Sequence, residues 1–201
     1  TNGRNQYTGI GAATPTYDLR GNLTGAGGSS YGYDAFNRLI TSGSATLVYD
    51  PVGRLHQTTS NGTTVTARFL YDGAVAIAEY DGLNALQRRY VHGPGMDQPL
   101  VEYVGSGTGS RRWLIADQVG SVVAHTDSAA ASIAVNTYDE YGQPGSSNTG
   151  RFQFTGQMWL GDAQLYHYKA RVYLPAIGRF AQTDPILFSG GMNLYAYVDN
   201  D

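Results

Sequence analysis

The sequence of 201 residues contains no cysteine, and this absence removes several kinds of chemistry. A disulfide framework, a thiol nucleophile and a zinc site held by cysteine are all excluded. The cellular compartment stays open, because a chain without cysteine survives in oxidising and reducing surroundings alike.

Charged residues are also scarce: Asp, Glu, Lys and Arg make up 14% of the chain, and the net charge is −3. No run of Lys or Arg exceeds two residues, as at Arg88-Arg89 and Arg111-Arg112. We expect no nucleic-acid partner, because the basic patch that binds phosphates is missing. No apolar stretch approaches the ~20 residues needed to cross a bilayer, so we expect no membrane span. The chain starts at Thr1 rather than Met and shows no signal-peptide pattern, so we expect it to be a fragment of a longer protein.

Glycine and tyrosine are abundant instead, with 27 Gly and 16 Tyr. Tyrosine favours strands and glycine favours tight turns, whereas helices prefer Ala, Leu, Glu and Lys. This composition predicts an all-β fold made of many short strands joined by tight turns.

A repeat of Tyr-Asp pairs runs through the chain. Three copies start at Tyr17, Tyr33 and Tyr49 and share the pattern Tyr-Asp-x-x-Gly/Asn-Asn/Arg-Leu, with sixteen residues from one Tyr to the next. Looser copies start at Tyr71, Tyr80 and Tyr138. Sixteen residues accommodate two strands of about five residues and two short turns, so each copy predicts a β-hairpin. One hairpin cannot bury its own apolar face, so the hairpins should stack into a curved or spiralling antiparallel sheet.

Each position of the pattern has a physical role. Tyr should end a strand, with its ring on a half-buried face and its hydroxyl in water. The Asp should open a turn, because its carboxylate accepts the backbone N–H two residues on. We expect this role for Asp18, Asp34, Asp50 and Asp72. Gly or Asn supplies a backbone with positive φ, and Leu returns the chain to the apolar face.

Recognisable sites for metals or cofactors are missing. The four histidines, His56, His92, His125 and His167, have no ligand spacing relative to one another, so we expect no metal site. The chain has no phosphate-binding loop, no dinucleotide fingerprint and no nucleophile elbow, so we expect no cofactor.

The C-terminal part contains a series of specific strings in a fixed order. They are Gly120-Ser121-Val122 with Thr126-Asp127, Tyr138-Asp139 with Tyr141-Gly142, Phe154-Thr155-Gly156-Gln157, residues 165–171, Gly178-Arg179-Phe180, Thr183-Asp184-Pro185 and Asn193-Leu194-Tyr195-Ala196-Tyr197. This ordered set resembles the Rhs repeat-associated core domain, and the whole chain resembles the C-terminal part of a bacterial Rhs/YD-repeat protein. We accordingly divide the chain into a YD-repeat β-strip, residues 1–118, and a core domain, residues 119–201.

The resemblance implies an architecture and a function. In this family a long β-strip spirals into a hollow shell that encloses a toxic C-terminal domain, and the core domain closes one end of the shell. The implied partners are the chain's own toxin domain and the remaining shell of the parent. The implied location is outside a bacterium or on its surface, as for an exported toxin.

The resemblance also implies an aspartyl-type autoprotease that releases the toxin from the intact parent. Carried over residue by residue, its first acid is Asp184, and the arginine of its Gly-Arg-Phe element is Arg179. Arg179 should hold the acid region in position by charge-assisted bonds. Two carboxylates that share a proton can act as acid and base toward a water molecule.

This chain departs from the family pattern at several positions. Leu187 and Phe188 stand where the family has Gly and Leu, and Leu174 stands before Pro175 in place of an Asp. The sequence ends before a second Asp-Pro element, so it holds at most half of the acid pair and we expect the fragment to be inactive. Asp184 also fits a purely structural role, as a turn residue before proline.

Three functions remain open: a shell segment, a self-cleaving protease centred on Asp184, and a cell-surface module that binds carbohydrate or protein through exposed Tyr residues. The repeat favours the shell, because it runs through most of the chain while the protease depends on one Asp. An isolated piece of such a sheet has open edges, so we expect it to self-associate through its edge strands or to close on itself.

Overall fold

The computed structural model describes residues 1–198 and has the predicted all-β fold. Thirteen strands form one antiparallel sheet in which each strand pairs with the strands before and after it in sequence. They are β1 (Thr16–Tyr17), β2 (Leu23–Ala26), β3 (Ser29–Tyr33), β4 (Leu39–Ser42), β5 (Ala45–Tyr49), β6 (Leu55–Ser60), β7 (Thr64–Asp72), β8 (Val75–Tyr80), β9 (Leu86–His92), β10 (Pro99–Val104), β11 (Arg111–Ala116), β12 (Val122–Thr126) and β13 (Ser132–Val135). The prediction of stacked antiparallel hairpins is confirmed.

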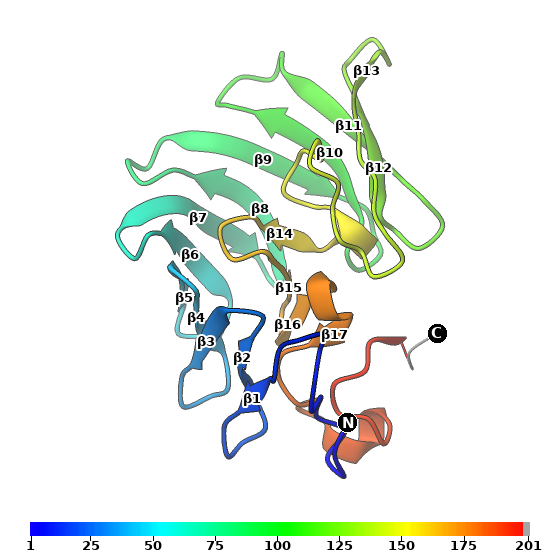
Figure 1. The fold of residues 1–201 in the computed structure, drawn as a ribbon. Coiled ribbons are helices and arrows are strands. Elements are labelled where there is room, and N and C mark those ends of the chain that lie inside the picture. Colours follow the sequence, from blue (N-terminus) through cyan, green and yellow to red (C-terminus); the bar gives the residue numbers. More distant parts are fainter. Residues whose placement is uncertain (199–201) are drawn as a thin grey trace.

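A second, four-stranded antiparallel sheet follows near the C-terminus. Its strands are β14 (Met158–Leu160), β15 (Leu165–Tyr168), β16 (Arg171–Leu174) and β17 (Arg179–Phe180). Short 3₁₀ turns cover Phe154–Gly156, Pro175–Ile177 and Leu187–Gly190. Figure 1 shows the large sheet, blue to green, following a curve, with the small sheet, yellow to orange, on its inner side. Within the described residues, no helix has the length and hydrophobicity to cross a membrane.

The repeated Asp closes its turns in one recurring way. In the turn that joins β3 to β4, Asp34 Oδ1 accepts the backbone N–H of Phe36 at 2.8 Å and that of Arg38 at 3.0 Å. The same two bonds, to residues two and four positions on, recur at Asp18, Asp50, Asp81, Asp117, Asp127 and Asp139. These bonds satisfy backbone donors that the turn takes out of the sheet, which confirms the predicted role of Asp18, Asp34 and Asp50.

Asp72 does not follow this scheme. It is the last residue of β7 and pairs with Val75, so the turn begins only at Gly73, which has φ +55°. The connection between β7 and β8 is therefore two residues long, and the Asp72 carboxylate is not needed to close it. Its expected role as the turn-closing Asp is wrong for this reason.

The other positions of the pattern behave as expected, and the arginine adds a contact. Asn37 has φ +63°, and the Leu that follows the turn is fully buried, as at Leu39. Arg38 forms an ion pair of 2.7 Å with Asp34, and its guanidinium lies over the ring of Tyr49 with 4.8 Å to the ring centroid. Asp50 and Arg54 form the same pair at 2.7 Å, and Arg54 lies 5.1 Å from the Tyr71 ring centroid, so in these two repeats the Asp fixes an Arg that packs on the Tyr of the next repeat.

The Tyr hydroxyls lie elsewhere than expected. Tyr71 donates to the Leu55 carbonyl at 2.8 Å and Tyr138 to the Val122 carbonyl at 2.7 Å, in each case sixteen residues back. Both carbonyls belong to the first residue of a strand, next to a point where the register with the preceding strand shifts. The expectation that these hydroxyls reach water is therefore wrong: they join one hairpin to the next.

The two sheets share one hydrophobic core. Leu23, Leu39 and Leu55 of the large sheet belong to the same buried cluster as Leu165 and Val172 of the small sheet. The large sheet also runs past residue 118, through β12 and β13, to Val135. No break in the sheet marks the division at residues 118 and 119, and the small sheet begins only at Met158.

Candidate functional site

Asp184 lies four residues after β17 and opens a turn. Its Oδ1 accepts the Ile186 N–H at 3.0 Å, and its carbonyl accepts the Leu187 N–H at 2.9 Å. This is the start of the same turn that the repeat uses. The Asp184 N–H, however, donates to the Leu194 carbonyl at 2.9 Å, so the turn closes against a distant residue rather than against its own fourth neighbour.

The second carboxylate oxygen of Asp184 binds an arginine. Arg171 Nη2 lies 3.0 Å from Asp184 Oδ2, and both side chains are largely buried. The Arg171 guanidinium also stacks on the Phe180 ring, with 3.7 Å to the ring centroid. Burial lowers the pKa of Arg171, and the Asp184 charge opposes this effect. Arg171 Nη1 is buried and has no hydrogen-bond partner among the described residues.

Arg179 holds a different part of the chain. Its Nη1 donates to the Asn5 carbonyl at 2.7 Å, and its guanidinium stacks on the Tyr7 ring at 3.8 Å from the centroid. Arg179 thus ties the N-terminal segment to β17, while the ion pair to Asp184 comes from Arg171 on β16. Arg171 ends the string that begins at Leu165, so the signal was present in the sequence, but the pairing depends on the hairpin that brings β16 beside β17.

Leu187 stands at the position where the Rhs pattern described above has a Gly. Its backbone has φ +53°, a left-handed conformation that Gly adopts freely and that costs a side-chain-bearing residue roughly 1–2 kcal/mol. The Asp184 turn thus keeps the backbone shape that suits a Gly, although a Leu occupies the position.

An aromatic cluster fixes the small sheet beside Asp184. Tyr166, Tyr173 and Phe180 are buried together and pack against Phe154, Trp159, Tyr168 and Tyr197. The Tyr166 hydroxyl donates to the Gly142 carbonyl at 3.0 Å and the Tyr173 hydroxyl to the Tyr141 carbonyl at 2.8 Å. The cluster therefore joins the Asp139 turn to β15 and β16.

A buried ion-pair network joins the two sheets, and sequence reasoning missed it. Glu79 on β8 is almost fully buried, and its carboxylate lies 2.6 Å from Arg151 Nη2 and 3.3 Å from Arg88 Nη1. Tyr90 donates its hydroxyl to the same carboxylate at 2.9 Å. Burial raises the pKa of Glu79, but Arg151 and Arg88 outweigh it and hold the pKa below its usual value. The sequence feature that could have indicated this network is Glu79, which stands inside the otherwise apolar strand β8.

A cavity of about 310 Å³ lies where the two sheets meet, and two of the four histidines line it. His92 Nε2 lies 3.0 Å from the Ala76 carbonyl, which places the proton on that nitrogen. Burial lowers the pKa of His167 to about 4, with Lys169 adding to the effect, so this imidazole is neutral near pH 7. Leu55, Met158 and other apolar residues form most of the wall, so the cavity suits an apolar group better than an ion. Residues 1–198 contain no cluster of three or more His, Asp or Glu side chains able to hold a metal.

The fold of this chain is similar to parts of known structures. The chain superposes on a crystal structure of TcdB2-TccC3 with a TM-score of 0.60 and 19% identity, over 95% of this chain and 10% of the other. The chain shares its fold with part of a Tc toxin. A second match, to the Photorhabdus luminescens Tc holotoxin pore, has a TM-score of 0.53 and 18% identity over 94% of this chain and 12% of the other.

Sequence relatives are also toxins and nucleases of bacteria. The chain is 29% identical over 155 residues to the tRNA3(Ser)-specific nuclease WapA of Bacillus spizizenii, which covers 72% of this chain and 6% of WapA. It is 41% identical over 58 residues to the toxin protein Tse5 of Pseudomonas aeruginosa, 29% of this chain and 4% of Tse5. It is 33% identical over 93 residues to the double-stranded DNA deaminase toxin A of Burkholderia cenocepacia, 42% of this chain and 6% of that protein. No family model matches the chain. The chain thus spans about one-twentieth of the length of these relatives.

Proposed function

We propose that the chain is a segment of the shell of an Rhs-type toxin that a bacterium exports, and that the shell encloses a toxic domain of the same parent chain. The observation that carries the proposal is the uninterrupted meander of thirteen strands, which curves around a small sheet and shares its fold with part of TcdB2-TccC3. The toxin names of the sequence relatives support the same function.

Protection of the enclosed domain tests this proposal. In the parent protein, the toxic domain should resist an added protease for as long as the shell is intact. Leu39→Asp and Leu55→Asp place a charge at two fully buried positions of the large sheet and should open the shell. The proposal fails if the toxic domain of the wild-type parent is digested as fast as the same domain alone.

We further propose that the core region contributes to autoproteolytic release in the intact parent, with Asp184 as one acid. The support is local: the Asp184 carboxylate is mostly buried, Arg171 binds it, and Arg171 Nη1 is buried beside it without a partner. That nitrogen is a ready donor for a second carboxylate. A second acid must come from the parent, because residues 1–198 supply no other carboxylate to Arg171.

Self-cleavage of the parent tests this second proposal. Asp184→Asn removes the acid and keeps the turn hydrogen bonds, so it should abolish cleavage, while Arg171→Lys should slow it because Lys cannot bind two carboxylates with a fixed fork. Cleavage of Asp184→Asn at the wild-type rate would rule the assignment out.

A surface-binding module is the second candidate function. Tyr141 is exposed at the rim of a hollow that Phe154, Tyr173 and Tyr197 also line, and such aromatic surfaces stack on sugars and on peptides. A glycan array should then show binders that Tyr141→Ala loses. An array without binders would remove the carbohydrate version of this function.

A further inference from the structure

The cavity between the two sheets is lined by residues of both, and neither the shell nor the release of a toxin requires it. Its volume is about 310 Å³. Pockets for small molecules measure roughly 300–1,000 Å³, so this cavity has the size for a compound of one or two rings. Four buried apolar side chains line it: Leu55 of β6, Ala76 of β8, Met158 of β14 and Phe152.

The cavity opens to solvent beside the turns of both sheets. Five of its lining residues are exposed, and they come from the turns or strand starts at the same end of the strands: Val52, Ala74, Val75, Gly95 and Ala170. A molecule in solution can therefore reach the buried apolar wall without unfolding either sheet.

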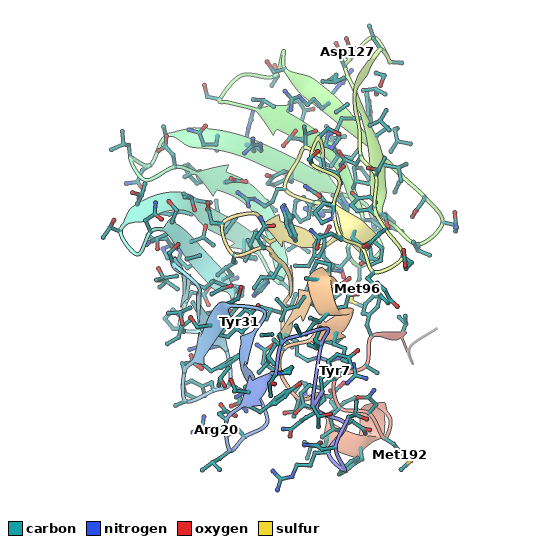
Figure 2. The ribbon with its side chains drawn as sticks, in the orientation of Figure 1. Tyr7, Arg20, Tyr31, Met96, Asp127 and Met192 are labelled. Carbon is teal, nitrogen blue, oxygen red and sulfur yellow. The ribbon has the colours of Figure 1, made fainter. Side chains whose placement is uncertain are left out.

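The loop that joins β9 to β10 is fixed in place as one side of this opening. A side chain at Gly156 would collide with the Asp97 carbonyl oxygen, so the loop lies directly on the turn of Phe154–Gly156. Lys169, in the turn between β15 and β16, forms an ion pair with the Asp97 carboxylate. Figure 2 labels Met96 in this loop. The loop is held to the small sheet at two points, so the site is formed before a ligand arrives.

The charges around the cavity are neutralised within the protein. The Arg54 guanidinium lies 2.7 Å from the Asp50 carboxylate, and Lys169 is paired with Asp97. The Tyr71 hydroxyl, which also lines the cavity, donates to the Leu55 carbonyl. A ligand that carried a net charge would find no unpaired opposite charge among these groups, so the site suits a neutral molecule.

His167 is the polar group of the cavity that the protein leaves for a ligand. It is 5% exposed, pairs with Met158 across the β14–β15 ladder, and its ring centroid lies 6.0 Å from that of Tyr49. Burial, with Lys169 second, lowers the pKa of His167, and no hydrogen bond from a described residue contributes. Buried polar groups are nearly always hydrogen-bonded. A neutral imidazole has one acceptor nitrogen and one N–H donor, so His167 can bind a hydroxyl group.

We propose that the cavity binds a small neutral phenol, whose ring packs on Phe152 and Met158 and whose hydroxyl donates to the acceptor nitrogen of His167. An aromatic ring has favourable contacts with a second ring and with a thioether sulfur. A phenol hydroxyl is also more acidic than an alkyl hydroxyl, which makes it the better donor to an imidazole. This inference goes beyond the proposed function, since it concerns a small-molecule site in the wall whatever the shell encloses.

Two matched probes test the proposal on the wild-type chain near pH 7. 4-Ethylphenol has the hydroxyl, whereas 4-ethylanisole carries a methyl group on the same oxygen and cannot donate. Isothermal titration calorimetry should show 4-ethylphenol binding about tenfold more tightly, the difference that one hydrogen bond makes. In NMR spectra 4-ethylphenol should shift the imidazole signals of His167 and leave those of His56, which is exposed and outside the cavity.

Three variants locate the binding. His167→Phe keeps a ring beside Tyr49 but removes both nitrogens, so the two probes should bind it with nearly equal affinity. Ala76→Leu fills part of the cavity and should weaken both probes about tenfold or more. His56→Phe, the matched change at an exposed position, should leave both affinities unchanged. Circular dichroism checks the fold of each variant, and the comparison of the two probes on the wild type decides the proposal even if a cavity variant does not fold.

Four outcomes would overturn the proposal: no saturable binding of 4-ethylphenol, equal affinity of the wild type for the two probes, binding that leaves the His167 signals in place, and discrimination that survives in a folded His167→Phe variant. N-acetyl-L-tyrosinamide is the remaining probe. If it binds more tightly than 4-ethylphenol, the cavity receives a tyrosine side chain of a polypeptide, and the assignment to a small phenol is wrong. None of these results bears on protection of the toxic domain, which tests the proposed shell separately.

Discussion

At the scale of the residue, the turn carboxylate does two tasks in the repeats of Asp34 and Asp50. Asp34 uses one oxygen to accept two backbone N–H groups and the other to bind Arg38. The first task was predictable from the sequence, because turn formation depends only on residues within the turn. The second partner of the Arg, the ring of Tyr49, depends on how hairpins stack and was not predictable.

Removal of a turn carboxylate should therefore destabilise the chain. Asp34→Ala leaves two backbone donors without their acceptor and should lower the free energy of unfolding by about 1–3 kcal/mol. Urea denaturation followed by circular dichroism measures the change. Asp72→Ala is the matched control, since Asp72 ends a strand and is exposed, and it should have almost no effect. Equal losses in the two variants would contradict the assigned role.

The buried histidine of the cavity should make stability depend on pH. The pKa of His167 falls from 6.5 to about 4 on folding, so between these values the unfolded chain binds a proton that the folded chain does not. Stability should then fall as the pH falls through this window, by about 3 kcal/mol from this residue. His167→Gln should flatten the pH dependence of the unfolding free energy between pH 6.5 and 4, while His56→Gln, at an exposed position, should not. An unchanged slope in His167→Gln would show that the imidazole is not buried as a neutral group.

At the scale of the element, neighbouring hairpins are joined by side chains as well as by strand pairing. Tyr71 on β7 donates to the Leu55 carbonyl on β6, where the register of β5 and β6 shifts. The sixteen-residue period predicted the hairpins and the buried Leu residues, because both follow from local patterning. It did not predict the irregularities, which arise where a strand meets a turn, and so it placed the Tyr hydroxyls in water.

Loss of one such hydroxyl should have a measurable effect. Tyr71→Phe keeps the ring but removes the hydrogen bond to the Leu55 carbonyl, and it should reduce the free energy of unfolding by about 1 kcal/mol. Thermal and urea denaturation both report this change. Tyr80→Phe serves as the control, because Tyr80 also ends a strand beside a turn Asp and its hydroxyl has no hydrogen-bond partner among the described residues. A neutral Tyr71→Phe would contradict the joining role.

The pairing of Asp184 with an arginine also depends on how the strands are arranged. The string Thr183-Asp184-Pro185 contains Asp184, which is mostly buried and forms an ion pair with Arg171. The arginine was expected to be Arg179, five residues away, but the hairpin of β16 and β17 places Arg171 against Asp184. Side-chain pairing across strands depends on register, which a single sequence does not reveal. The catalytic role of Asp184 and Arg179 stays a prediction.

At the scale of the whole molecule, the strip and the core region form one body. Arg151 binds Glu79 on β8 and donates to the Trp159 carbonyl on β14, so it connects the two sheets through groups buried in the shared core. The division at residues 118 and 119 follows from the resemblance and stays a prediction, while the bond between Arg151 and Glu79 joins residues on either side of it.

The two tryptophans can show whether the large and small sheets unfold together. Trp113 lies on β11 of the large sheet and Trp159 on β14 of the small one. Trp113→Phe leaves a fluorescent reporter in the small sheet and Trp159→Phe leaves one in the large sheet. Because the core is shared, both variants should show one urea transition with the same midpoint. Two separated transitions would show that the sheets unfold as independent domains.

The central claim is that this strip forms part of the wall of a closed shell, and a cryo-electron microscopy map of the parent protein tests it most directly. The map should show β2 to β12 as wall strands whose inner side faces an enclosed volume that contains polypeptide density, with the small sheet on that inner side. An open strip whose inner side faces solvent, with no polypeptide enclosed, would contradict the claim.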